Sequence, residues 1–386
     1  MPAELTITSA HPVIVHAGQG NWVFVKIETD AGITGIGEGS LKGKARTIAA
    51  GIEDAGRYLV GRSPLDPPWI WDLIYEADRF HGGPILTSVM SAIDMACWDI
   101  VGKFRQQPVW QLLGQPCRDK VQLYGRLCRS GSPQENLAGL IGLVRQQGYQ
   151  AIKAGFHVTG EAAVDQSAIH QACVAQFTQL REALGDGVDL CLDTHAMLAV
   201  ENVIALAGDL QPLALAFLEE PVPPEDIEGL RSVRQHTSVP LATGERLMTR
   251  FGFRPLIEEE LVDIIQPDIC HCGGITELKR IAEMAATRGI KVSPHNPSSH
   301  SELATMASIH VDACISNFAM QEHPAEVPPW RYEIFEEQIE IENGYACLPD
   351  RPGLGLTLRD DVVSRHPYQS YTRQCLFNPD GSPART

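Results

Sequence analysis

The chain has 386 residues, of which 44% are hydrophobic and 20% charged, so it can bury a large core and does not have the composition of a disordered protein. Its 31 Lys and Arg against 48 Asp and Glu give a formal net charge of −17, which argues against proteins that bind nucleic acid or an anionic membrane through a basic face. A small anionic substrate is compatible with this net charge, because it responds to the local electric field and to any bound cation.

The ends and the cysteines suggest a cytoplasmic chain. The N-terminal MPAELTITSA has no basic segment followed by an apolar one, and no run of about 18 apolar residues occurs, so we expect neither a secretion signal nor a transmembrane helix. Ten cysteines are scattered without a CxxC pair, and the closest spacing is Cys270-His271-Cys272. We therefore expect reduced thiols. From the net charge and the apolar pattern we expect no membrane and no nucleic acid as partners.

The N-terminal part has an α+β pattern. Residues 22–29 (WVFVKIET) precede the turn Asp30-Ala31-Gly32 and a second alternating run, which predicts an antiparallel pair of strands. Residues 43–60, 69–78 and 85–103 have helical spacing, and the last carries apolar residues on more than one face, which is typical of a buried helix.

Two glycine patterns resemble phosphate-binding loops but miss them. Gly35-Ile36-Gly37-Glu38-Gly39 lacks the GxGxxG spacing and lies in a predicted meander. Gly43-Lys44 lacks the P-loop spacing, because Glu38 stands where the first glycine belongs. We interpret these residues as turn glycines.

After about residue 120, short apolar runs alternate with helical stretches. The runs lie at residues 121–125, 150–155, 188–195, 215–220, 240–245, 263–268, 290–295 and 318–323. This alternation predicts a parallel barrel of the (β/α)8, TIM-like type; a doubly wound parallel sheet is the alternative, but it would want a glycine-rich phosphate turn after an early strand. We expect an N-terminal α+β capping domain at 1–118, the modified barrel at 119–326, and a segment at 327–386 that returns to the capping domain.

Polar residues stand at the C-terminal ends of the predicted barrel strands, about one strand–helix unit apart. They are Lys153, Asp193, Glu219, Glu245, Asp268, His295 and Glu322. Any single one could be a helix cap or a solvated loop residue. Because the ends of successive barrel strands meet at one mouth, where barrel enzymes place their active sites, we expect these side chains to converge.

Three of these residues, Asp193, Glu219 and Glu245, are carboxylates on adjacent strands. Carboxylates at one site repel one another unless a cation neutralises them, and oxygen ligands suit a hard cation, most often Mg²⁺. A surface acidic cluster is the alternative, but surface acids do not normally end apolar core strands.

Asp268 and His295 end neighbouring strands, and a carboxylate beside an imidazole orients the ring and makes it a stronger base. A structural hydrogen bond in the barrel rim is the other interpretation. His195 lies two residues beyond Asp193, so strand alternation turns it toward the same mouth, where it could act as an acid.

Six motifs resemble the mandelate racemase branch of the enolase superfamily, and within it the galactonate dehydratase group. The resemblance covers nearly the whole chain, from residues 23–39 to 352–358. The strongest stretches are GGPILTSVMSAIDMACWDIVGK (82–103), LDTHA (192–196), FLEEPV (217–222), TGERL (243–247), QPDICHCGGITE (266–277) and SPHNP (293–297).

The resemblance implies roles for the strand-end residues. Asp193, Glu219 and Glu245 match the Mg²⁺ ligands, and His295 paired with Asp268 matches the base. His195 matches the general acid of the dehydratases. Glu322 matches the residue that hydrogen-bonds the enediolate oxygen that faces away from the metal.

The resemblance also implies an acidic sugar as substrate and a homo-oligomer. Loops of the capping domain near residues 16–21 and 81–83 are then expected to contact the distal end of the substrate, which makes His81 a candidate. Arg126 and Lys153 could pair with the substrate carboxylate or hydroxyls, and Asn296 stands beside the base. His81 and Arg126 could equally be plain surface residues.

One departure from the family pattern bears on the reaction. Many members carry Lys-x-Lys on the second barrel strand, with the second lysine as a base on the other face of the substrate, whereas this chain has Lys153-Ala154-Gly155. Dehydration of a sugar acid to a 2-keto-3-deoxy acid is therefore favoured over racemisation or epimerisation. A lactone cycloisomerase and a non-catalytic barrel that binds acidic sugars stay as alternatives.

Overall fold

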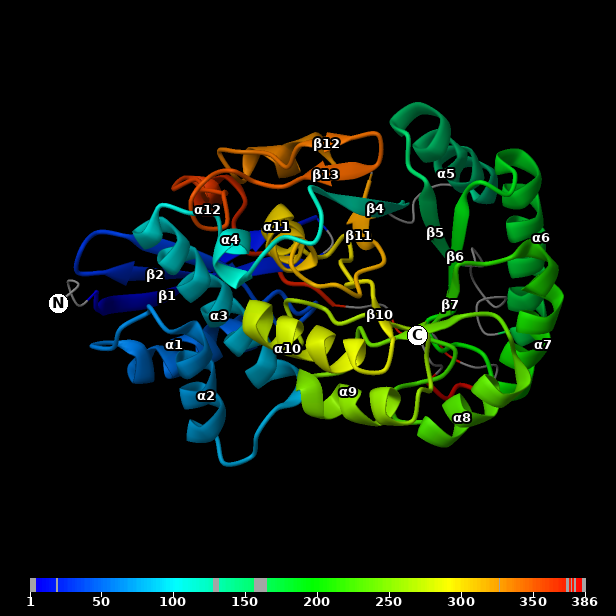
Figure 1. Cartoon of the computed structure of the whole chain (residues 1–386), viewed down its shortest axis with the longest axis horizontal. Helices are drawn as coiled ribbons and strands as arrows, with labels where there is room; N and C mark the ends of the chain where they lie inside the picture. The colour runs from blue at the N-terminus through cyan, green and yellow to red at the C-terminus, as the bar shows by residue number, and fades with distance from the viewer. Residues whose placement is uncertain are drawn as a thin grey trace.

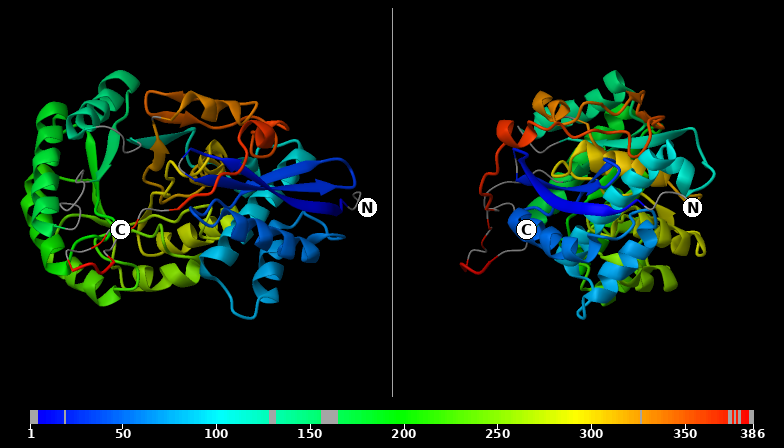
Figure 2. Two further views of the ribbon diagram at one scale, coloured as in Figure 1. Left: turned by 180° about the vertical axis from the view of Figure 1, so that it is seen from behind. Right: turned by 90° about the vertical axis from the view of Figure 1, so that its left-hand side faces the viewer.

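The computed structural model of the chain describes residues 5–18, 20–127, 132–155, 165–325, 327–372, 375, 377 and 380–383. An α+β capping domain lies at one end of the molecule and a parallel barrel at the other, as Figure 1 shows from the front. Figure 2 shows the same arrangement from behind and from the capping side. The predicted boundary at residue 326 and the first four residues lie outside the described residues.

The capping domain has the predicted α+β organisation. Its antiparallel sheet has the order β1-β2-β3, with strands β1 (Ile7–His16), β2 (Asn21–Thr29) and β3 (Thr34–Glu38). Its helices are α1 (Ala45–Leu59), α2 (Pro67–Ala77), α3 (Gly83–Arg105) and the short α4 (Val109–Leu113).

Helix α3 is the buried helix that the sequence predicts. Among the described helices it is the one long and apolar enough to cross a membrane, but 83% of its most apolar window is buried inside the protein. Its apolar composition therefore reflects packing on both sides, against β3 and α1 of the capping domain and against α10 of the barrel.

The glycines at 35, 37 and 39 are not turn residues. Gly35 and Gly37 lie within β3, and Gly39 directly follows it. A Cβ at any of them would meet the backbone of α3, at 2.1 Å from Ala96 O, 1.9 Å from Ala92 O and 2.3 Å from Ser88 O respectively. The alternating glycines thus let a helix backbone lie directly against a strand, a close approach that only a residue without a side chain permits.

Among the described residues the barrel contains eight parallel strands, as the sequence predicts. They are β4 (Lys120–Arg126), β5 (Ala151–Gly155), β6 (Asp189–Asp193), β7 (Phe217–Glu219), β8 (Leu241–Thr243), β9 (Ile264–Ile265), β10 (Lys291–Val292) and β11 (Gln321–Pro324). The helices between them are α5 (Pro133–Gln147), α6 (Gln166–Leu184), α7 (Val200–Leu210) with the 3-10 turn η2 (Gln211–Leu213), α8 (Ile227–His236), α9 (Thr249–Glu258), α10 (Gly274–Ala286) and α11 (Glu302–Asp312).

The barrel closes where its first and last strands meet. β11 pairs in parallel with β4, and the seam between the β10 and β11 segments is a single bridge from Val292 to Phe318. In the described part of the chain β11 is followed by the 3-10 turn η3 (Pro329–Glu333) and the hairpin β12 (Ile341–Glu342) and β13 (Tyr345–Cys347), so a C-terminal segment takes the place of an eighth helix.

The C-terminal segment contacts both domains. β13 pairs antiparallel with β4 of the barrel. Gly353 forms a bridge with Pro108, and α12 (Val362–Arg365) lies against β1 of the capping domain. The segment therefore ties the two domains together from the outside.

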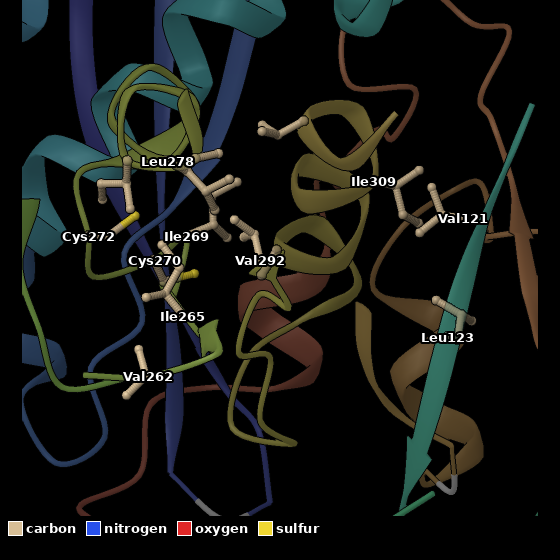
Figure 3. Close-up of a cluster of buried hydrophobic side chains, with 14 of the residues drawn as sticks. Val121, Leu123, Val262, Ile265, Ile269, Cys270, Cys272, Leu278, Val292 and Ile309 are labelled. Atoms are coloured by element: carbon tan, nitrogen blue, oxygen red, sulfur yellow. The ribbon is translucent and has the colours of Figure 1, made fainter. Parts of the chain in front are cut away.

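The largest apolar core lies between the barrel strands and their surrounding helices. Figure 3 shows part of it, with Ile265 of β9, Val292 of β10 and Leu278 of α10 on one side and Leu123 of β4 on the other. These side chains are fully buried. Close packing below the mouth holds the strand ends in fixed positions.

We predict that Gly37→Ala destabilises the protein strongly, because the new Cβ meets the carbonyl of Ala92 and either β3 or α3 must move. The expected cost in the free energy of unfolding is about 3 kcal/mol, measured by denaturant unfolding.

Gly208→Ala is the matched control. Gly208 lies inside α7 with no atom within 4 Å of the added Cβ, so this change should stabilise the protein by up to about 1 kcal/mol. Equal effects of the two substitutions would contradict the proposed contact between β3 and α3.

Candidate active site

The polar residues predicted at the strand ends lie at one mouth of the barrel. Asp193 is the last residue of β6 and pairs in register with Glu219, the last residue of β7. Glu245 follows β8 by two residues, and Glu322 lies within β11. Because all these strands are parallel, their C-terminal ends bring the carboxylates together.

Three carboxylates form a cluster that could hold a metal ion. One oxygen each of Asp193, Glu219 and Glu245 lie within 4.8 Å of one another. Asp193 and Glu219 are buried, and one Glu219 oxygen, Oε2, has no hydrogen-bond partner among the described residues. An unpartnered buried oxygen within an all-oxygen donor set fits a hard cation such as Mg²⁺.

The ammonium of Lys153 is the positive charge nearest to this cluster. Its Nζ lies 2.9 Å from Glu219 Oε1 and 3.9 Å from Asp193 Oδ2, and the side chain is 4% exposed. Burial raises the pKa of Glu219 to about 8, and Lys153 offsets only part of this effect. The charge of Lys153 alone therefore does not keep the Glu219 carboxyl fully ionised at neutral pH.

Asp268 and His295 form a close pair. His295 Nδ1 and Asp268 Oδ2 are 2.7 Å apart, and both residues are buried. The other ring nitrogen, Nε2, faces the mouth, 3.1 Å from Glu245 Oε2 and 3.9 Å from Glu322 Oε2. Although burial opposes it, the negative charges of Glu245, Glu322 and Asp268 raise the pKa of His295 to about 10.

His195 stands on the opposite wall. In the sheet order, three strands separate β6, after which His195 follows, from β10, after which His295 follows. His195 Nε2 lies 3.0 Å from Asp193 Oδ2, and its backbone N–H donates to Asp193 Oδ1 at 2.8 Å. The backbone of His195 is strained, because its φ of 48° lies in the left-handed region. The two contacts with Asp193, at the end of β6, hold the residue in this conformation.

Glu322 lies between the base and Lys153. Its Oε1 is 2.9 Å from Lys153 Nζ and 3.4 Å from Arg126 Nε, and its Oε2 accepts the backbone N–H of Asn296 at 3.0 Å. Although burial opposes it, Lys153, His295 and Arg126 lower the pKa of Glu322 to about 2. While the imidazole of His295 is positively charged, this carboxylate accepts hydrogen bonds.

The structure brings together every expected residue except His81. The side chain of His81 stacks on Tyr75 at 4.5 Å between ring centres and faces Glu76 at 3.9 Å, and both partners belong to α2. The contacts found for it among the described residues thus lie within the capping domain, and its side chain is 42% exposed.

A hollow beside His195 includes residues that the sequence analysis did not single out. Asn136 of α5 and Gln176 of α6 line it together with Arg126, Lys153 and His195. Glu220 is also near, with Arg246 Nε 2.6 Å from its Oε1. Asn136 and Gln176 lie within barrel helices, where nothing in the sequence pattern distinguishes them from solvent-facing polar residues.

Comparison with known families agrees with this architecture. Residues 4–114 match the model of the mandelate racemase / muconate lactonizing enzyme N-terminal domain, and residues 137–362 match the enolase C-terminal domain-like model. The chain is 37% identical over 352 residues to a D-galactonate dehydratase of Klebsiella pneumoniae (strain 342), covering 89% of this chain and 90% of that protein. It is 36% identical over 355 residues to a D-galactonate dehydratase of Ralstonia pickettii (strain 12J), with 89% and 90% covered.

Solved structures with the same fold cover the whole molecule. A crystal structure of an enolase from Pantoea ananatis with bound D-gluconate and Mg superposes with a TM-score of 0.90 at 28% identity, covering 99% of this chain and 100% of that one. An enolase from Agrobacterium radiobacter with bound Na and L-malate gives a TM-score of 0.91 at 28% identity and the same coverage. The chain belongs to the mandelate racemase / muconate lactonizing enzyme family of the enolase superfamily.

Proposed function

We propose that the protein is a Mg²⁺-dependent hydro-lyase that dehydrates a sugar acid, of the aldonic, galactonate-like class, to a 2-keto-3-deoxy acid. The observation that carries the proposal is the placement of two histidines on opposite walls of the mouth, with the carboxylate cluster between them. The two relatives named D-galactonate dehydratase and the neighbour with bound D-gluconate and Mg support the same reaction and substrate class.

Removal of a proton beside a carboxylate is difficult because the product carries two negative charges on one group. Asp193, Glu219 and Glu245 would hold a Mg²⁺ ion, which would supply the positive charge that lowers this cost. These three residues fit the ion by their donor atoms and by the unpartnered oxygen of Glu219.

We assign the base to His295 and its orientation to Asp268. The Nδ1–H bond to Asp268 leaves Nε2 as the atom that takes the C2 proton. His195, on the other wall, then gives a proton to the departing 3-hydroxyl. Gly155 stands where many relatives carry a second lysine, so the other face of C2 has no base from that strand, which favours elimination over racemisation.

The substrate-binding assignments are proposals of the same kind. Lys153 and Arg126 are placed beside Glu322, so we assign them to the substrate carboxylate and hydroxyls. We assign the hydrogen bond to the substrate oxygen that faces away from the cation to Glu322, together with Lys153, whose Nζ lies 2.9 Å from Glu322 Oε1. Asn296 donates its backbone N–H to Glu322, and His81 stays a candidate for the distal end of the substrate.

We also propose that the protein is a cytoplasmic homo-oligomer. The nine cysteines in the described part of the chain are all free, which suits a reducing compartment. Sedimentation analysis of the purified protein tests the oligomeric state directly.

The substrate assignment is tested by incubating the protein and Mg²⁺ with four- to six-carbon aldonic and aldaric acids and detecting 2-keto products with semicarbazide. We expect a 2-keto product from a galactonate-like acid, and we expect EDTA to abolish its formation. Absence of a keto product from every acid, together with solvent-deuterium incorporation at C2, would instead point to epimerisation or lactone chemistry.

We predict that the two histidines act at different steps. His295→Asn should abolish exchange of the C2 proton with solvent deuterium, whereas His195→Asn should lower dehydration by about 10³-fold and leave exchange measurable. NMR of the recovered substrate measures exchange. Equal loss of both activities in both variants would contradict this division of roles.

Mg²⁺ binding should release protons near neutral pH. Without a cation, Glu219 with a pKa of about 8 and His295 with a pKa of about 10 both hold protons at pH 7. A bound cation favours the ionised carboxylates and opposes the field of Glu245 on His295, so the Mg²⁺ affinity should rise with pH, by up to about tenfold per pH unit for each displaced proton.

Calorimetry in two buffers of different ionisation enthalpy counts the released protons. Asp193→Asn is the control that removes a ligand and should abolish the binding heat. If the Mg²⁺ affinity were the same at pH 6 and pH 8, the prediction that Glu219 and His295 hold protons in the absence of a cation would be wrong.

A further inference from the structure

Asp268 has two more histidines beside it, between the strand ends and the capping domain. Its Oδ2, the oxygen paired with His295, lies 3.5 Å from His300 Nδ1 and 3.9 Å from His271 Nε2. One ligand atom from each of Asp268, His271 and His300 lies within 4.8 Å of the other two. The proposed reaction uses neither His271 nor His300.

The outer nitrogen of each of these histidines is held by the capping domain. His271 Nδ1 lies 3.0 Å from the hydroxyl oxygen of Ser88 in α3. The ring of His300 bonds the backbone of Ser40, and because Nδ1 has no hydrogen-bond partner among the described residues, this bond falls on Nε2. Both rings therefore turn their inner nitrogens toward Asp268, as metal-binding histidines do when an outer hydrogen bond fixes their orientation.

The inner nitrogen of His300 is an unsatisfied buried atom. The side chain is 1% exposed, and Nδ1 has no hydrogen-bond partner among the described residues. A neutral imidazole has one N–H, which the Ser40 carbonyl accepts at Nε2. The Nδ1 lone pair then faces a carboxylate oxygen that is also electron-rich, and a cation between the two atoms removes the conflict.

We propose that Asp268, His271 and His300 form a second cation site, one that takes a borderline divalent transition ion such as Zn²⁺ and not Mg²⁺. Two imidazoles and one carboxylate are the donor set that such ions prefer, whereas Mg²⁺ prefers oxygen alone. Ligands about 2.1 Å from a tetrahedral ion lie about 3.4 Å apart, close to the separations from Asp268 given above.

The turn that carries His271 is built rigidly. Its neighbours Cys270 and Cys272 are fully buried, and Figure 3 shows both within the apolar cluster beside Ile269 and Leu278. The Asp268 carboxylate also accepts the backbone N–H of Cys270 at 2.8 Å. The position of His271 Nε2 is thus fixed by packing on both sides of it, which favours a preformed site.

An ion at this site acts on the base through a shared oxygen. Once Mg²⁺ compensates the charge of Glu245, Asp268 Oδ2 still raises the proton affinity of His295, so a cation bound at Asp268 would weaken the base further and slow proton abstraction. This consequence rests on the proposed function, and the binding itself does not. Zn²⁺ is therefore expected to inhibit while Mg²⁺ is saturating.

Titration of the Mg²⁺-saturated protein with Co²⁺ tests the site, because four-coordinate cobalt with imidazole ligands has strong visible bands and six-coordinate cobalt in an oxygen site has weak ones. We expect one equivalent of strong bands, removed by Zn²⁺. Absence of these bands in the wild-type protein would overturn the proposal.

Two variants remove the inner nitrogens and keep the outer contacts. His271→Asn retains a polar group near Ser88, and His300→Gln retains one near Ser40. Each should weaken Co²⁺ binding at least about tenfold, with circular dichroism checking the fold. His170→Asn is the matched control, since it alters a surface pair in which His170 Nε2 lies 2.8 Å from Asp209 Oδ2 and should leave the bands unchanged.

The outcomes separate this site from the proposed reaction. Strong cobalt bands lost in His271→Asn and His300→Gln support the site even if no sugar acid is dehydrated. Bands lost only in His170→Asn would assign the ion to the surface and overturn the proposal. Dehydration that Zn²⁺ leaves unchanged, with the ion bound, would overturn the inhibitory effect alone.

Discussion

Negative charge buried at one mouth of the barrel is the constraint on which the rest of the structure depends. Asp193, Glu219 and Glu322 lie within a few ångströms of Lys153, and all four side chains are buried. Carboxylates this close repel one another strongly in a medium of low dielectric constant. The packed strands below the mouth keep these carboxylates close together. The site therefore attracts cations and protons, because both reduce the repulsion.

Helix α3 of the capping domain supports this arrangement through hydrogen bonds. The Oγ of Ser91 accepts the backbone N–H of Gly273, and the Oδ2 of Asp94 accepts that of Thr276, both at 3.0 Å. These N–H groups belong to the N-terminal end of α10, where the backbone N–H groups have no acceptors within the helix itself. Helix α3 of the capping domain therefore supplies hydrogen-bond acceptors to the segment that follows Asp268, the partner of His295.

Much of this could be predicted from the sequence, because the barrel imposes a rule on it. Apolar runs at regular spacing place their final polar residues at one mouth, and the structure brings Asp193, Glu219 and Glu245 together there. The glycines of β3 could not be interpreted in the same way, since their role depends on a helix that lies far along the chain. The sequence also gave no sign that His271 and His300 face one carboxylate, because each follows an irregular loop whose direction no periodicity fixes.

The placement of Glu245 joins the cation site to the base. The same carboxylate that is a metal-ligand candidate lies 3.1 Å from His295 Nε2, the nitrogen that we propose accepts the C2 proton. While this charge is uncompensated, His295 holds a proton too tightly to act as a base near neutral pH. A cation bound at Glu245 would weaken the field that holds this proton. In the proposed reaction, cation binding would therefore also free Nε2 of His295 to act as the base.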